Sequence, residues 1–271
     1  MSEHRHDEPT THLQEDMRKM INRRWLVAML AGGTGVAAAS FGLKGGTPAM
    51  AKACTVMPTE TRGPFPADGS NNAHGTMANV LLDSGLIRRD MRKSFGEMTG
   101  VADGRQLELE MKVTDASNGC SPLAGNLVYA WHCTADGQYS IYNIESENYL
   151  RAAGVTDENG IVRFTTIYPG CYPGRAPHVH FEVYPSAEQA TSYQDRLLAS
   201  QFAFPDAINE AVYTRDAAYA ASQKPFEDIR QRGDVIFDDA NSVERRAQTL
   251  NMAVTEGEVL RGSIEVALAS A

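Results

Sequence analysis

Positive charge is under-represented in this sequence. Its 25 lysines and arginines are outnumbered by 34 aspartates and glutamates, which gives a formal net charge of −9. Binding to nucleic-acid phosphates needs clustered lysine and arginine, so this balance argues against nucleic acid as a partner. Repeats at the periods typical of solenoids and propellers are also missing, and 271 residues suit one large domain or at most two.

Cysteine is scarce as well, and no two of the four cysteines lie in a C-x-x-C spacing. A metal site built on cysteine is therefore disfavoured. The four residues are Cys54, Cys120, Cys133 and Cys171. An exported chain could form disulfides from them, and the sequence leaves all three complete pairings open.

Long apolar runs are missing apart from residues 25–43, a charge-free stretch weakened by four glycines. The polar residues before it end in the pair Arg23-Arg24, and Ala49-Met50-Ala51 after it has the form of a small-residue cleavage site. This layout predicts a secretory signal over residues 1–51, and the paired arginines resemble the twin-arginine type. The predicted location is periplasmic or secreted, with membrane contact only during export. A membrane anchor, or an apolar helix in a cytoplasmic protein, is the alternative.

Residues 52–104 are rich in proline and glycine and predict a loop-rich arm before a domain of residues 105–271. Alternation of apolar and polar residues then predicts short strands separated by Gly, Asp and Asn turns. The expected strands are 106–113, 126–132, 138–142, 161–167, 178–184 and 198–204, with a helix over 205–223 and a closing hairpin from 247–254 and 258–269. This pattern predicts a mainly β fold, an antiparallel β-sandwich with peripheral loops and a short helix.

The stretch from Ile167 to Pro185 concentrates residues that can bind a metal. His178 and His180 are two apart on a predicted strand, so both imidazoles face the same side. Prolines and glycines before them exclude a regular helix and indicate a shaped loop. The pair alone is compatible with zinc, copper or cupin-type sites, or with two structural histidines.

Several further motifs make the chain resemble the intradiol ring-cleavage dioxygenases, the family of catechol and protocatechuate 3,4-dioxygenases. The resemblance covers roughly residues 63–204. Its motifs, in chain order, are Glu60–Phe65, Trp131 with Gly137-Gln138-Tyr139, Thr165–Pro173, Arg175–Phe181 and Gln201–Phe204. The number of independent motifs and their order make the match specific.

The resemblance implies a ferric iron bound by Tyr139, Tyr172, His178 and His180. Phenolate is a hard anionic donor that suits Fe(III), and tyrosine ionises at neutral pH only beside a cation. The implied substrates are a small aromatic diol and O2, both of whose atoms enter the ring to give a cis,cis-muconate-type diacid. In this reading Tyr172 also acts as a base and Arg175 stabilises developing charge, while Gln201 is a polar group beside the substrate.

Alternatives remain for the chain and for its residues. The chain could be a non-catalytic, transthyretin-like β-sandwich binding module, or a zinc or copper enzyme that uses the His-x-His pair. Tyr139 could be a surface turn residue, Tyr172 a packing aromatic, Arg175 an ion-pair partner and Gln201 an ordinary strand residue. His132 lies inside the match without an implied role, which favours a structural one.

Two departures from the family pattern matter. The link from Tyr172 to Arg175 is short, and Gly174 stands where many members have a longer insert and a tryptophan. The substrate therefore stays open. The region before Gly104 lacks the long helical segment through which the catechol dioxygenase subgroup dimerises, so a homo-oligomer also stays open.

Overall fold

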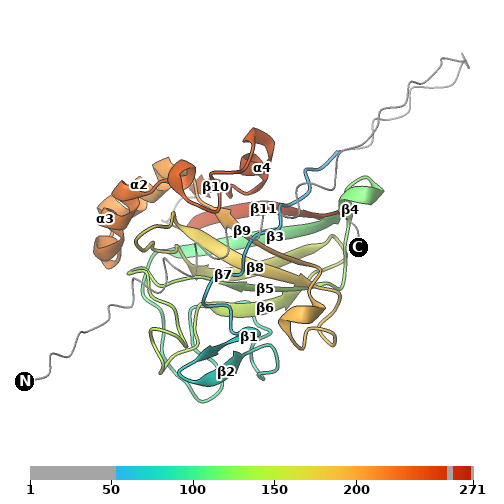
Figure 1. Cartoon of the computed structure of the whole chain (residues 1–271), viewed down its shortest axis with the longest axis horizontal. Helices are drawn as coiled ribbons and strands as arrows, with labels where there is room; N and C mark the ends of the chain where they lie inside the picture. The colour runs from blue at the N-terminus through green and yellow to red at the C-terminus, as the bar shows by residue number, and fades with distance from the viewer. Residues whose placement is uncertain (1–52, 255–258, 270–271) are drawn as a thin grey trace, which may run out of the picture. The chain divides into compact units, whose positions relative to one another are not determined.

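The computed structural model describes residues 53–254 and 259–269, so the predicted signal over residues 1–51 lies outside the described residues. The described strands form two larger sheets and one separate hairpin (Figure 1). The strands are β1 Asp68–Ala73, β2 Thr76–Asn79, β3 Gln106–Asp115, β4 Ser121–Pro122, β5 Leu127–Trp131, β6 Arg151–Val155, β7 Ile161–Ile167, β8 His178–Tyr184, β9 Leu198–Ala203, β10 Asn251–Val254 and β11 Leu260–Leu268. The described α-helices are α2 Asp206–Arg215, α3 Ala220–Asp228 and α4 Ser242–Ala247.

Strand β3 is the centre of the first sheet. It pairs with β11 along one side and with β7 and β4 along the other, and β10 continues the sheet beyond β11. The pairing of β3 with β11 is parallel, with Leu107 opposite Leu260. The other pairings between these strands are antiparallel, as the sequence predicted, and β3 with β11 is the exception among the described strands. Most of the domain separates the two strands in the chain, and such a separation allows a parallel pairing that a tight turn cannot make.

The second sheet has the order β6–β5–β8–β9 and is antiparallel throughout. Its inward side chains, such as Phe181 of β8, pack with those of the first sheet, such as Leu109 of β3 and Phe164 of β7, in one buried cluster. Alternation along each strand produces this packing, because every second residue points to the same face. The predicted β-sandwich is confirmed.

The other face of the second sheet is covered as well. Leu127, Tyr129 and Trp131 of β5 pack there against Ala67 and Phe95 of the segment before β3, in a separate buried cluster. That segment was predicted to be loop-rich, and it also contains the β1–β2 hairpin, whose polar residues gave no apolar alternation. Its position matters for function because it covers the face of β8 that carries both histidines.

After β9, the chain forms helices α2 and α3, which Figure 1 shows beside the strands. The sequence predicted one helix over 205–223, but Asp216 is extended and its side chain accepts from the Ala218 amide, which separates α2 from α3. The closing hairpin is confirmed as the antiparallel pair β10 and β11. No helix within the described ranges is long and apolar enough to cross a membrane.

Three local features differ from or complete the sequence prediction. Residues 138–142 form no strand, because Asn143 Oδ1 accepts from the Tyr139 amide and Ile141 has a positive φ of 73°, which turns the chain. Strand β6 was not predicted, since its small residues carry no alternation. A disulfide joins Cys54 to Cys120. Cys133 and Cys171 are buried and form no disulfide, so only one of the two bonds of that complete pairing is present.

Candidate metal centre

Two histidines of β8 form the base of the candidate site. Antiparallel pairing places His180 opposite Trp131 of β5 on one side and opposite Gln201 of β9 on the other. His178 and His180 are both buried, and their Nε2 atoms lie 3.0 Å apart. The Trp131 ring stacks on His180, with the planes within 4° of parallel. The same-face arrangement predicted from the His-x-His spacing is therefore present.

Both predicted tyrosines reach the same point from loops. The Tyr139 hydroxyl lies 3.4 Å from His178 Nε2 and the Tyr172 hydroxyl 3.3 Å from the same atom. Metal–nitrogen and metal–oxygen bonds of about 2 Å place neighbouring donors roughly 3 Å apart. The donor atoms of Tyr139, Tyr172 and His180 thus lie at the distances from His178 Nε2 that the ligands of one ion would have.

Gly137 explains how the Tyr139 loop approaches the Tyr172 loop. Its φ is +85°, and a Cβ at this position would come 2.6 Å from the Cys171 carbonyl oxygen and 3.3 Å from Tyr172 Cβ. Only glycine combines that backbone conformation with so close a contact. The Gly-x-Tyr spacing seen in the sequence is therefore a packing requirement of the site.

A hydrogen bond fixes the form of the His178 ring. Its Nδ1–H donates to the Ala176 carbonyl oxygen at 2.6 Å, so the Nε2 lone pair points at the donor cluster. A backbone carbonyl in this role sets the tautomer of a metal-binding histidine. Burial, and then the nearby Arg175 charge, lower the His178 pKa well below its usual value, which keeps the ring neutral.

The other three donors are neutral for the same reason. Burial, followed by the neighbouring His178, lowers the His180 pKa well below its ordinary value. Burial raises the Tyr139 pKa well above 10, and it raises the Tyr172 pKa to about 12 against the opposing effect of Arg175. The phenols would ionise once a cation enters between them.

This donor set fits a hard trivalent cation. Two neutral imidazoles and two phenols become two nitrogen and two anionic oxygen ligands, the combination that ferric iron prefers over soft-ligand metals. Within the described residues, no three His, Cys, Asp or Glu side chains gather to form a metal site of the carboxylate or thiolate kind. The residues present therefore agree with the iron ligands that the resemblance implied.

Arg175 borders the cluster and is itself buried. Its Nη1 lies 3.3 Å from His178 Nε2, Nη2 donates to Gln201 Oε1 at 2.6 Å, and Nε donates to Asp234 Oδ2 at 2.8 Å. Arg175 and Gln201 therefore both lie at the site, and the alternative of Arg175 as an ion-pair partner is also correct. Asp234 was missed by the sequence analysis, because it lies 59 residues away from Arg175 in a segment without a motif.

The arm closes the site from the other side. A Cβ on Gly63, whose φ is +70°, would come 3.0 Å from His180 Cε1. The Phe65 ring lies 4.8 Å from the Tyr139 ring, measured between centroids. The motif Glu60–Phe65 thus belongs to the site through contact with its donors.

His132 does not join the cluster. Its Nε2 pairs with the Thr166 hydroxyl at 2.7 Å and its Nδ1 with the Cys133 carbonyl oxygen at 2.8 Å, so both nitrogens have partners away from the site. This arrangement agrees with the structural role expected from the sequence.

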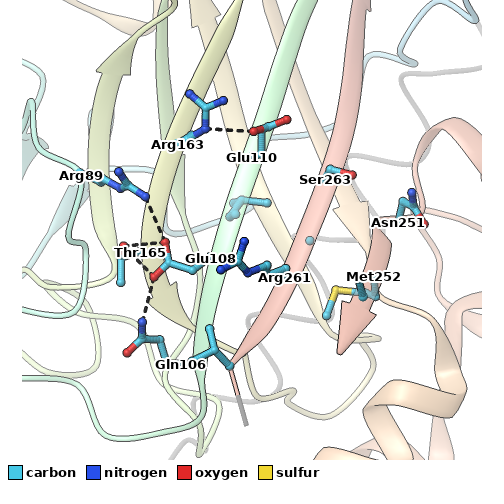
Figure 2. Close-up of a pocket in the computed structure, with 14 residues that line it drawn as sticks. Arg89, Gln106, Glu108, Glu110, Arg163, Thr165, Asn251, Met252, Arg261 and Ser263 are labelled. Carbon is cyan, nitrogen blue, oxygen red and sulfur yellow. Dashed lines mark hydrogen bonds and ion pairs between the residues drawn. The ribbon is translucent and has the colours of Figure 1, made fainter. Parts of the chain in front are cut away.

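A separate hollow of about 670 Å³ lies on the outer face of the first sheet (Figure 2). Arg163 pairs with Glu110 and Arg89 with Glu108 across it. None of the donor residues lines this hollow. It is a polar sheet surface with paired charges, and the candidate metal centre does not include it.

Comparison with known proteins agrees with this geometry. The sequence model of the family described as Dioxygenase matches residues 86–235, more than half of the chain. The chain belongs to this dioxygenase family. Four of the five motifs noted in the sequence, and all four donor residues, lie within the matched range.

Two similar proteins are informative. The protocatechuate 3,4-dioxygenase beta chain of Burkholderia cepacia is 29% identical over 137 residues, which cover 45% of this chain and 54% of that protein. The match thus spans about half the length of that relative. The intradiol ring-cleavage dioxygenase from Tetranychus urticae superposes with a TM-score of 0.60 at 21% identity, covering 79% of this chain and 95% of that chain. The latter likeness confirms the intradiol dioxygenase fold.

Proposed function

We propose that this protein is a non-haem Fe(III) intradiol dioxygenase that opens a catechol-type ring and inserts both atoms of O2. The product would be a cis,cis-muconate-type diacid, in which all atoms of diol and O2 are retained and no external reductant is needed. The observation that carries the proposal is the convergence of Tyr139, Tyr172, His178 and His180 on one point.

Bound ferric iron would supply the positive charge that ionises the phenols and the electron acceptor that prepares the diol for O2. Tyr172 is suited to take a substrate proton, because it is the more exposed of the two phenols and Arg175 opposes the rise in its pKa. Tyr139 is 1% exposed and packed under Phe65, which suits a donor that stays in place.

Arg175 would stabilise the negative charge that develops during the reaction. Its Nη1 faces the cluster from a buried position, where a fixed positive charge interacts more strongly than it would in water. Negative charge that develops on the ring and its oxygens would be stabilised there. Trp131, stacked on His180, and Phe65 exclude water from the donor side of the site.

Export is part of the proposal. The signal-like residues 1–51 support it, and so does the Cys54–Cys120 disulfide, since disulfides persist mainly in oxidising compartments. Expression with the native N-terminus, followed by separation of periplasmic and cytoplasmic fractions, tests it. Replacement of Arg23-Arg24 by Lys-Lys should leave the protein in the cytoplasm if the twin-arginine reading is correct.

Colour and ring opening test the activity. Two tyrosinates on Fe(III) give a visible charge-transfer band, which zinc-loaded protein lacks, and added catechol should shift that band. Ring-opening absorbance and O2 uptake should then rise in a one-to-one ratio with catechol, protocatechuate or hydroxyquinol. A colourless iron-loaded protein that leaves every diol of this panel intact would overturn the proposal in favour of a binding module or another metal.

A further inference from the structure

The guanidinium of Arg175 is held at two nitrogens and leaves the third facing the donor cluster. Nε is fixed by Asp234 and Nη2 by Gln201, while Nη1 lies 3.3 Å from His178 Nε2. A guanidinium is planar and rigid, so two fixed nitrogens determine the direction of the third. The direction of Nη1 is therefore set by the residues that hold Nε and Nη2.

Asp234 is itself fixed in orientation. It is fully buried, and its Oδ1 accepts from the Ile236 amide at 2.8 Å. Its Oδ2 accepts from both Arg175 Nε, at 2.8 Å, and the Ala176 amide, at 2.7 Å. The Ala176 carbonyl in turn accepts from His178 Nδ1–H. One carboxylate thus holds the arginine and the peptide that orients a donor histidine.

Gln201 provides the second support from a different part of the chain. Its Nε2 donates to the Thr61 carbonyl oxygen at 2.6 Å, which leaves Oε1 directed at Arg175 Nη2 at 2.6 Å. Gln201 therefore links Arg175 to the arm, and Asp234 links Arg175 to the segment after α3. The hydrogen bonds of the two supporting residues go to Arg175 and to backbone groups, and not to the phenol oxygens or the imidazole Nε2 atoms.

We propose that Asp234 is a positioning residue for the ring-opening reaction, which orients Arg175 so that Nη1 points at the substrate position. This rests on the proposed dioxygenase function. Asp234 contacts Arg175 at Nε, so the Nη1 hydrogens stay available for an oxygen of the substrate. Loss of the Asp234 carboxylate frees the arginine to rotate away from the cluster. Because the carboxylate also accepts from the Ala176 amide, turnover has to be compared per bound iron.

Kinetics per bound iron provide the first test. Asp234→Asn should lower kcat/KM by about 10- to 100-fold, mostly through kcat, because the lost interaction forms with the transition state. Asp238→Asn is the matched control, since Asp238 lies in the same segment with an exposed side chain. An Asp234→Asn protein with a lower Tm and lower iron content but wild-type turnover per bound iron would overturn the proposal.

Chemical rescue separates orientation from general damage. In Arg175→Ala, Asp234 remains to bind guanidinium in the vacated space, so added guanidinium should restore part of the turnover. Urea, which has a similar shape and no charge, and sodium chloride should not. The double variant Arg175→Ala/Asp234→Asn should fail to respond to guanidinium. An equal response of the two variants, whether recovery or none, contradicts the proposal.

A measurement without turnover distinguishes this proposal from the function on which it rests. In gallium-loaded protein with 15N-labelled arginine, the buried Nε–H of Arg175 should exchange slowly, and Arg175→Lys assigns its signal. Asp234→Asn should lose that protection and Asp238→Asn should keep it. If this holds but no diol is opened, the dioxygenase function fails and the placement of Arg175 stands. If rings are opened and Asp234→Asn leaves the protection intact, the positioning proposal fails.

Discussion

The two faces of β8 carry different chemistry although the whole strand is buried. One face carries Val179, Phe181 and Val183, which pack into the core between the two sheets. The other carries His178 and His180, which face the arm. Alternation of this kind normally indicates that one face of a sheet meets water. Here the polar face is covered, so its side chains must find partners inside the protein.

Those partners continue beyond the donor cluster. Glu182 follows His180 on the same face, and burial, followed by the nearby Asp68 charge, raises its pKa to about 8. The Tyr184 hydroxyl donates to Glu182 at 2.6 Å. The core face stabilises the fold by excluding water, whereas the arm face depends on specific polar partners. Substitutions on the two faces should therefore change different properties.

The largest expected effect follows removal of a donor from the arm face. His178→Ala deletes the nitrogen around which the other three donors gather, so the protein should lose its iron and all measurable ring cleavage. Its Tm in the metal-free state should fall less than that of a core-face variant, because the main loss is one hydrogen bond to the Ala176 carbonyl. Iron content by absorption spectrometry, measured with thermal unfolding, checks this. Retained iron together with full turnover would contradict the ligand assignment.

Removal of one phenol oxygen should have a smaller effect that depends on which phenol is changed. Tyr172→Phe should slow substrate binding by about 10²- to 10⁴-fold, the usual contribution of a positioned base, while most of the iron is retained. Tyr139→Phe is the matched comparison and should lose more iron, since Tyr139 is the more buried donor. Stopped-flow binding of catechol at the charge-transfer band measures both variants. Equal iron loss in the two variants would contradict the assignment of different roles to Tyr139 and Tyr172.

The His-x-His face was predictable because strand alternation is local. Convergence of the two tyrosines was expected only through resemblance to a family, since Tyr139 and His178 are 39 residues apart. Nothing local indicated Asp234, whose role depends on how the segment after α3 meets the loop before β8. Strand β6 was missed because its small residues show no alternation, and the β1–β2 hairpin was missed because its residues are mostly polar and mostly half-buried or exposed.

A core-face substitution should affect stability and spare the metal. Phe181 is fully buried against Phe202, with 6.0 Å between ring centroids, so Phe181→Ala should cost about 3–5 kcal/mol of unfolding free energy. The Tm should fall by roughly 10 °C for a domain of this size. Iron bound per folded molecule should stay at the wild-type level. A Phe181→Ala protein with an unchanged Tm and lost iron would contradict the assignment of the core face to stability and the arm face to metal binding.

The smallest effect concerns a histidine on the core side. His132 contacts Thr166 of β7, and burial lowers its pKa to about 4, against the opposing hydrogen bond to the Cys133 carbonyl. The unfolded chain binds a proton there near pH 6.5, so the stability from neutral His132 is complete above pH 6.5 and is lost as the pH falls towards 4. At pH 4.5 this loss should amount to about 2.5 kcal/mol.

His132→Gln isolates that contribution, because glutamine can still donate and accept a hydrogen bond but does not titrate. Denaturant unfolding at pH 7 and pH 4.5, with both proteins at the same iron content, gives the stability lost on acidification. The variant should lose about 2.5 kcal/mol less than the wild type, since carboxylate protonation affects both proteins equally. An equal loss in both would mean that His132 is protonated in the folded protein, and that the core side also carries a titrating histidine.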